Sequence, residues 1–209
     1  MFVDFDGTIV NQDTAQIALD RFGDPDWVRL DEEYERGEMS FEECLRREFA
    51  MLKVPEEDII REVSRVTQLR PNFSQLVDYC KTRSVPMTVL SGGLDFCIRH
   101  FLNRDGWLDF MQIYSPTSKF TKDGYTVTFP RMFAESSTSF KDDLVRHERT
   151  KGARVYFVGN GFGDLSAAKE SDVVFAIKDS RLAQLCRQHK VVHTEVVDFL
   201  QVVDALVEV

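Results

Sequence analysis

Two aspartates near the N-terminus, Asp4 and Asp6, are the first residues whose types and spacing suggest chemistry. They follow a short apolar run and precede Gly7-Thr8, which predicts a strand that ends at a turn. Side chains two residues apart leave an extended chain in similar directions, so both carboxylates are expected to face one site. Such a pair could supply a nucleophile and a proton donor, or could simply be an aspartate-rich turn.

Three later features could bind a phosphate group or the cation that accompanies one. Ser91-Gly92-Gly93 follows an apolar run and opens a helical pattern, so a hydroxyl and free N–H groups are available to an anion. Lys141 begins another helical pattern and offers a compact cation. The glycine-rich segment 159–164 carries Asn160 and Asp164, whose oxygens suit a hard cation. Each feature alone has an ordinary explanation as a tight turn or a surface lysine, so only their combination indicates a phosphate site.

Apolar and amphipathic segments alternate along most of the chain, which predicts the elements that position these residues. Strands are predicted at 1–5, 86–90, 111–114, 125–129, 154–158 and 173–176. Helices are predicted at 73–83, 94–103, 140–149, 165–170 and 182–188, and a last segment at 196–206 completes the chain. Strands that alternate with helices predict an α/β fold with a doubly wound parallel sheet. The carboxyl ends of such strands are where ligands bind, and most of the candidate residues follow a predicted strand.

Residues 13–70 interrupt this alternation with one helical pattern after another. Helices are predicted at 15–22 and 25–36, and Ser40 with Glu43 predicts a capping box at the start of the next. Pro55 then fits the first turn of a further helix. We therefore expect a small helical cap at 13–70, inserted into a core domain formed by residues 1–12 and 71–209.

Composition limits the possible functions. The chain has 209 residues, 43% of them hydrophobic, and a net charge of −9, so general affinity for nucleic acid is not expected. No stretch approaches the ~18 apolar residues of a membrane span, so no membrane partner is expected. The four cysteines form no C-x-x-C pair and are expected to be reduced and buried, as in a cytoplasmic protein. Acidic residues from Asp4 onward are not typical of a signal peptide, and the few residues before Asp4 suggest a shortened N-terminus.

The motifs together resemble those of the haloacid dehalogenase superfamily of aspartate-nucleophile phosphatases. The resemblance rests on D-F-D-G-T from Asp4, on Leu90-Ser91-Gly92-Gly93, on Lys141 and on G-N-G-F-G-D from Gly159. It implies that the core is a Rossmann-like domain of this superfamily and that the helical segment is a cap of the C1 type. It also implies that Asp4 is the nucleophile, that Asp6 is the general acid and base, and that Ser91 and Lys141 hold the phosphoryl group.

The resemblance further implies a Mg²⁺ cofactor. Its ligands would be Asp4, the backbone carbonyl of Asp6, Asn160 and Asp164. Asn160 stands where the superfamily usually has an aspartate, and an uncharged ligand predicts weaker Mg²⁺ affinity, with Asp164 compensating directly or through water. Substrate contacts are expected from the following residues: Thr8, Gly92, Gly93, Asp13 and Glu48.

The expected substrate is a small phosphorylated metabolite, and the expected state is a monomer or a homodimer. Two subfamilies fit: the cap and the Leu90–Phe96 segment are most similar to the methionine-salvage phosphatases, and the entry to the cap is similar to the phosphoserine phosphatases. We rank phosphoserine second, because Glu48 replaces a cap arginine and would repel a carboxylate. A non-catalytic phospholigand-binding protein is an alternative that Asn160 suggests, and haloacid dehalogenase activity ranks below both.

Overall fold

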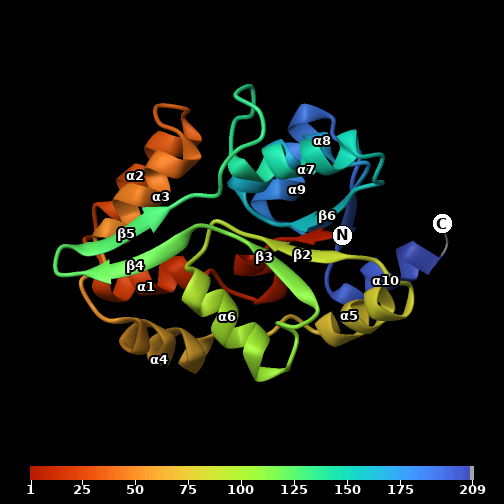
Figure 1. Ribbon diagram of the computed structural model, residues 1–209. Helices are drawn as coiled ribbons and strands as arrows, with labels where there is room; N and C mark the ends of the chain where they lie inside the picture. The colour runs from red at the N-terminus through yellow and green to blue at the C-terminus, as the bar shows by residue number, and fades with distance from the viewer. Residues whose placement is uncertain (208–209) are drawn as a thin grey trace.

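The computed structural model describes residues 1–207, and its centre is a six-stranded parallel sheet (Figure 1). The strands lie in the order β3 (Met111–Tyr114), β2 (Met87–Leu90), β1 (Phe2–Val3), β6 (Tyr156–Gly159), β7 (Val173–Ile177) and β8 (Thr194–Val196). All five neighbouring pairs are parallel. The strand order reverses between β1 and β6, so the predicted doubly wound α/β fold is confirmed and the switch point lies beside Asp4.

Helices cover both faces of this sheet because alternate strand residues bury their side chains on opposite sides. Phe2 and Phe157 pack into the core on the side of α7 (Phe140–Thr150), α8 (Leu165–Glu170) and α9 (Arg181–His189). Val3 and Val158 pack into the core on the other side, with α5 (Phe73–Thr82), α6 (Asp95–Arg104) and α10 (Phe199–Val207). The predicted segment 196–206 therefore divides into the end of β8 and the helix α10.

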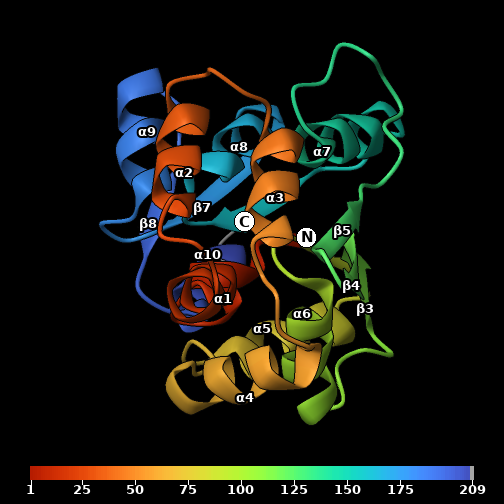
Figure 2. The same cartoon turned by 90° about the vertical axis from the view of Figure 1, so that its left-hand side faces the viewer.

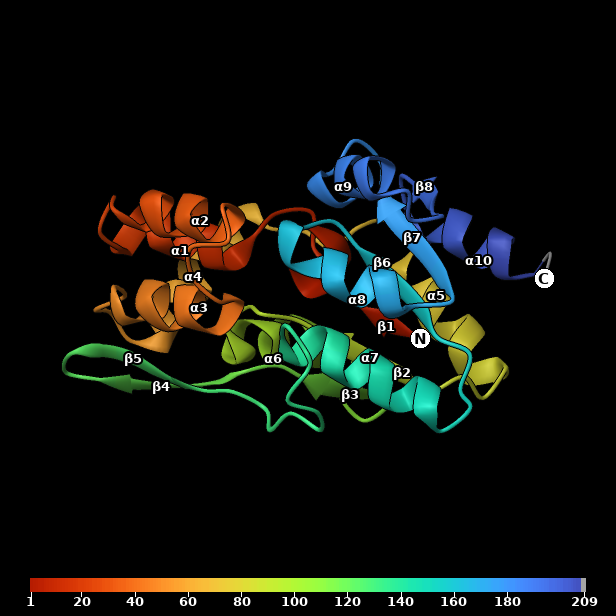
Figure 3. The same cartoon turned by 90° about the horizontal axis from the view of Figure 1, so that it is seen from above.

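Four helices lie between β1 and α5 in sequence and form a group beside the sheet (Figure 3). They are α1 (Thr14–Phe22), α2 (Trp27–Glu35), α3 (Phe41–Ala50) and α4 (Glu56–Val66). The helices predicted here are present, with ends shifted by a few residues. One of the two hydrogen bonds of the capping box is present, since Ser40 Oγ accepts the Glu43 N–H. The Glu43 carboxylate binds Arg46 instead of the Ser40 N–H. The chain enters and leaves the group at one place, where Val10 and Leu69 form a bridge.

A two-stranded antiparallel hairpin stands apart from the main sheet. It pairs β4 (Thr117–Thr121) with β5 (Gly124–Thr128), so the strand predicted at 125–129 is present but does not continue the parallel alternation. The sequence did not predict β4, because its exposed and mostly polar residues lack an apolar signal. The hairpin packs against α3, and Tyr125 Oη donates at 3.1 Å to the carbonyl of Val54, in the segment after that helix.

Two predictions from composition can be compared with residues 1–207. No helix in this part of the chain is both long and apolar enough to cross a membrane. The four cysteines are free and buried, as predicted.

Candidate active site

Three charged residues that are far apart in the sequence meet beside the switch point. Asp4 follows β1, and its backbone N–H donates to the carbonyl of Val158 on β6. Lys141 Nζ donates to Asp4 Oδ1 at 2.8 Å and to Asp164 Oδ1 at 2.7 Å. Asp4, Lys141 and Asp164 are 5%, 3% and 1% exposed. One buried ammonium therefore pairs with two buried carboxylates. The three residues lie together, as the sequence analysis expected.

The chain around the two N-terminal aspartates turns sharply after Asp4. Gly7 adopts a positive φ of 67°, which a residue without Cβ allows at little cost. Arg70 holds this turn, since its guanidinium donates to the carbonyls of Gly7 at 2.6 Å and Thr8 at 2.9 Å. Sequence reasoning did not assign Arg70 this role, because the contact joins two distant segments.

Asp6 is fixed through one carboxylate oxygen and free at the other. Its Oδ1 accepts hydrogen bonds from the backbone N–H of Thr14 at 2.7 Å and from Thr14 Oγ1 at 2.6 Å. Within residues 1–207, Oδ2 accepts none, and it faces Gly93. Burial raises the pKa of Asp6 well above its usual range, and the charges of Asp13 and Asp4 add to this. This rise shifts Asp6 toward its protonated form, which suits a proton donor.

The pKa of Asp4, the candidate nucleophile, is subject to opposing influences. Burial, with a contribution from Asp164, raises the pKa of Asp4 to about 7, while the ammonium of Lys141 opposes the rise. The ionised form of Asp4 thus has a cation beside it, whereas within residues 1–207 no cation acts on Asp6. Such different surroundings for two nearby carboxyl groups suit a nucleophile and a general acid.

The first turn of α7 positions Lys141. Ser139 and Asp142 form a reciprocal capping box there, so the helix begins at Phe140 and directs Lys141 toward β1. Asp143 orders the preceding loop by accepting the backbone N–H groups of Phe133 at 2.7 Å and Ala134 at 3.0 Å. The Ser-x-x-Asp spacing is a recognisable capping signal that sequence reasoning missed.

The serine and glycine loops complete the site. Ser91 is 1% exposed, and its Oγ accepts the Gly93 N–H at 3.0 Å. In the glycine-rich loop, Asp164 Oδ2 accepts the backbone N–H groups of Asn160 and Gly161, both at 2.9 Å. Because Lys141 and these two amides occupy both carboxylate oxygens, Asp164 supports the loop.

The Asn160 amide lies where three oxygens gather. With Nδ2 turned toward them, it donates to Thr8 Oγ1 at 2.8 Å, Asp6 O at 2.7 Å and Asp4 Oδ2 at 3.3 Å. With the opposite orientation, Oδ1 would join Asp6 O and Asp4 Oδ2 as a third hard oxygen ligand, and Thr8 Oγ1 would donate to it. Oxygen donors of this kind fit Mg²⁺. Thr8 is fully buried, and its hydroxyl bonds Asn160.

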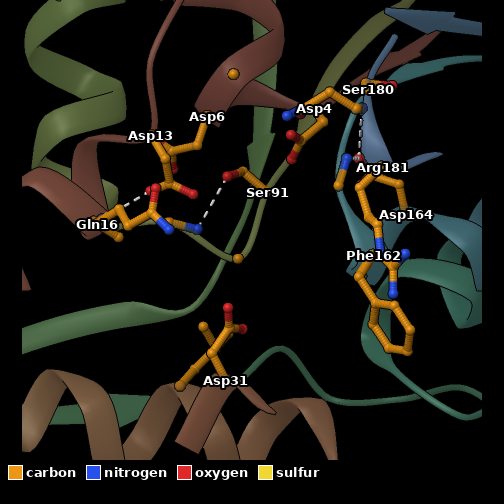
Figure 4. A pocket seen from close by; sticks show the side chains of 18 of the residues that line it. Asp4, Asp6, Asp13, Gln16, Asp31, Ser91, Phe162, Asp164, Ser180 and Arg181 are labelled. Atoms are coloured by element: carbon orange, nitrogen blue, oxygen red, sulfur yellow. Dashed lines mark hydrogen bonds between the residues drawn. The ribbon is translucent and has the colours of Figure 1, made fainter. Parts of the chain in front are cut away.

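A cavity of about 550 Å³ opens in front of these residues (Figure 4). Its floor includes the expected phosphate and metal residues: Asp4, Asp6, Ser91, Gly92, Gly93, Lys141, Asn160 and Asp164. Asp13 and Glu48, both expected to contact substrate, line its wall. Thr8 does not line it. Helices α1, α2 and α3 supply much of the remaining wall, including Trp27 and Leu45, and residues 177–181 supply another part of it.

Helices α2 and α3 lie in front of the sheet in Figure 2, and aromatic residues of both helices approach the phosphate loops. A Cβ added to Gly92 would lie 2.5 Å from Phe41 Cζ, and one added to Gly163 would lie 3.1 Å from Phe41 Cε2. The Tyr34 ring meets Phe162 edge-on with centroids 5.1 Å apart. Sequence reasoning assigned neither aromatic residue to the site, since helical spacing alone makes both look like core.

Comparison with known proteins agrees with this geometry. The family model described as haloacid dehalogenase-like hydrolase matches residues 1–169. The 2-hydroxy-3-keto-5-methylthiopentenyl-1-phosphate phosphatase of Geobacillus kaustophilus (strain HTA426) is 28% identical, covering 99% of this chain and 94% of that protein. The protein of the same name from Brevibacillus brevis is also 28% identical, covering 100% and 95%.

Solved structures show the same fold. A phospho-aspartyl intermediate analogue of phosphoserine phosphatase has a TM-score of 0.74 at 19% identity, covering 98% of this chain and 96% of that chain. A substrate-bound phosphoserine phosphatase complex has a TM-score of 0.73 at 18% identity, with the same coverage.

Proposed function

The chain belongs to the haloacid dehalogenase-like hydrolases and is a phosphatase of that family, and we propose that it is a Mg²⁺-dependent phosphomonoesterase that works through an aspartyl-phosphate on Asp4. One observation carries the proposal. Lys141 binds Asp4 and Asp164 together at the floor of a cavity that Asp6 and Ser91 also line.

In the first step, an Asp4 carboxylate oxygen attacks phosphorus and the bond to the ester oxygen breaks. Asp6 gives its proton to the departing oxygen, so the alcohol leaves neutral and an acyl phosphate remains on Asp4. Lys141 and the Ser91–Gly93 loop hold the phosphoryl oxygens, which bear the negative charge throughout.

In the second step, water attacks the phosphorus of the acyl phosphate. Asp6, now ionised, takes the proton from this water, the bond to the Asp4 oxygen breaks, and inorganic phosphate is released. Thr14 fixes the Asp6 carboxylate, so the same Oδ2 serves as acid and then as base.

Mg²⁺ would be held by Asp4, the Asp6 backbone carbonyl and Asn160, with Asp164 ordering the loop. When bound, it supplies charge neutralisation between the carboxylate nucleophile and the phosphate dianion. The Lys141 ammonium supplies part of the same neutralisation from the chain itself.

We further propose that residues 13–70 act as a cap that encloses the substrate, on a core formed by 1–12 and 71–209. Support comes from Phe41 and Tyr34, which lie over the glycine loops, and from the ion pair between Arg181 on α9 and Glu35 on α2 at 2.6 Å. Enclosure would exclude water and let cap side chains select the alcohol portion.

The substrate is a small phosphorylated metabolite. The curated relatives are named for 2-hydroxy-3-keto-5-methylthiopentenyl-1-phosphate, which makes this ester the first to test. Phosphoserine comes second, because Glu48 in the cavity wall offers no positive charge to pair with its carboxylate.

The test is release of phosphate from an aryl phosphate in Mg²⁺ and in a chelator, by the wild-type protein and by Asp4→Asn. We expect Mg²⁺-dependent release by the wild type and none by a folded Asp4→Asn. An inert wild-type protein that still binds phosphate esters would instead favour the second candidate, a non-catalytic phospholigand-binding protein, which the uncharged Asn160 suggests.

A further inference from the structure

The cavity wall supplied by α2 and α3 carries a cluster of acidic and thiol groups away from the phosphoryl site. Asp31, Cys44 and Glu48 each offer one polar atom, and these atoms lie within 4.8 Å of one another. All three residues line the cavity, and Figure 4 shows Asp31 pointing into it from the helical side. We call these three residues the acidic wall cluster.

Glu48 is the unusual member of this cluster. It is 7% exposed, and within residues 1–207 its carboxylate forms no ion pair with any lysine, arginine or histidine. Its polar neighbours are the Cys44 thiol and the Asp31 carboxylate, neither of which brings positive charge. An ionised carboxylate buried without a cation is costly, so Glu48 keeps its proton unless a cation reaches it, and its position in a binding cavity fits a cationic ligand.

Two other carboxylates around the cavity are already occupied. Glu35 is paired with Arg181, and Asp13 accepts the Gln16 N–H at the start of α1. Glu48 and Asp31 differ from these two, because within residues 1–207 no cation of the chain pairs with either of them.

The chemistry of the cluster favours an organic cation over a metal ion. The Cys44 thiol donates to the Leu30 carbonyl at 3.6 Å, and burial raises its pKa, so it stays a thiol and not a metal-binding thiolate. The remaining ligands are two carboxylates beside Trp27, whose ring also lines the cavity. Carboxylates and an aromatic ring suit an ammonium group.

We propose that the acidic wall cluster binds an ammonium group on the alcohol portion of the substrate, so that the preferred substrate is the phosphate ester of an amino alcohol without a carboxylate. This inference rests on the proposed function, since the phosphoryl end must occupy the floor of the same cavity.

The test compares phosphoethanolamine with propyl phosphate, which replaces the ammonium by a methyl group of similar size. We expect kcat/KM to favour phosphoethanolamine by about tenfold or more, as one charge-assisted hydrogen bond allows. Phosphoserine, which adds a carboxylate, should be poorer than phosphoethanolamine. The preference should fall about tenfold in Glu48→Gln and persist in Glu43→Gln, a matched change at a half-buried position of the same helix outside the cavity lining.

The outcomes separate the two proposals. Hydrolysis of an aryl phosphate without any preference for phosphoethanolamine, or a preference that Glu48→Gln leaves intact, overturns the ammonium site alone. Failure to hydrolyse any ester overturns the proposed function, and it also overturns the substrate class that depends on that function. Calorimetric titration of Asp4→Asn with the two esters gives a second measurement without turnover, and equal affinities would contradict the ammonium site.

Discussion

The side-chain amide of Asn160 lies 2.7 Å from the backbone carbonyl of Asp6 and directly beside the Asp4 carboxylate. The Asn160 side chain can present either Nδ2, which donates to this carbonyl, or Oδ1, which could bind a cation. Mg²⁺ would select the Oδ1 orientation.

We predict that Asn160→Asp tightens Mg²⁺ binding by about tenfold or more, because it adds a negative charge to the ligands. The same change should lower the melting temperature in a chelator, since a donor is replaced by a carboxylate next to Asp4. Calorimetric titration and thermal unfolding with and without Mg²⁺ measure both effects. Asn103→Asp, on the exposed side of α6, is the control, and equal Mg²⁺ affinity in Asn160→Asp would contradict the assignment.

Lys141 is predicted to stabilise the fold as well as the reaction. Lys141→Met removes the ammonium shared by Asp4 and Asp164 and leaves two buried carboxylates unpaired. The free energy of unfolding should fall by about 3–5 kcal/mol, measured by urea unfolding in a chelator. Lys151→Met, whose ion pair with Glu148 is exposed, should change it by less than about 1 kcal/mol. Similar losses in both variants would show that the buried contacts are not significant.

Gly93 is predicted to be needed for the position of Asp6. A Cβ at residue 93 would overlap Asp6 Oδ2, whereas a Cβ at Gly161 meets nothing closer than 3.7 Å. We expect Gly93→Ala to lower kcat on the order of 10²-fold by displacing the proton donor, with little loss of stability. Gly161→Ala should have a much smaller effect. Equal kcat values for the two variants, measured with an aryl phosphate, would argue against this packing.

Glu48 is predicted to make stability depend on pH. Burial, then the charge of Asp31, raises its pKa from the ordinary 4.5 to about 8, with Cys44 and Asp13 also nearby. Because the folded protein holds this proton more tightly than the unfolded chain, the contribution of Glu48 is complete below about pH 4.5 and is lost as pH rises through about 8.

Glu48→Gln removes this dependence, so its stability relative to wild type should grow by about 1–3 kcal/mol between about pH 5 and pH 8. Urea unfolding across this range, with Glu43→Gln as control, makes the comparison. Parallel profiles for wild type and Glu48→Gln would contradict the pKa assignment.

The sequence predicted the floor of the site because local patterns and sheet geometry determine it together. Asp4 follows a strand, Ser91 follows another, and Asn160 and Asp164 follow a third, and parallel strands bring their carboxyl ends to one edge. Lys141 could be assigned only through the resemblance, since an isolated lysine carries little information.

The wall of the site could not be predicted in the same way. Phe41 and Tyr34 approach the glycine loops only because α2 and α3 pack beside the sheet, and Arg70 reaches the Gly7 carbonyl across distant segments. The strand β4 was missed because a polar ribbon lacks the apolar signal of a buried strand. These are tertiary relationships, which residue spacing does not encode.

The central claim is that Asp4 becomes phosphorylated, and Asp6→Asn tests it directly. An aryl leaving group departs without a proton donor, but attack of water still needs a base, so the acyl phosphate should accumulate in this variant. We predict that acid-quenched Asp6→Asn, treated with aryl phosphate and Mg²⁺, gains the mass of one phosphoryl group on the peptide that contains Asp4. The Asp4→Asn, Asp6→Asn double variant should gain none. Phosphate release with no adduct, or an adduct on another peptide, would contradict the account.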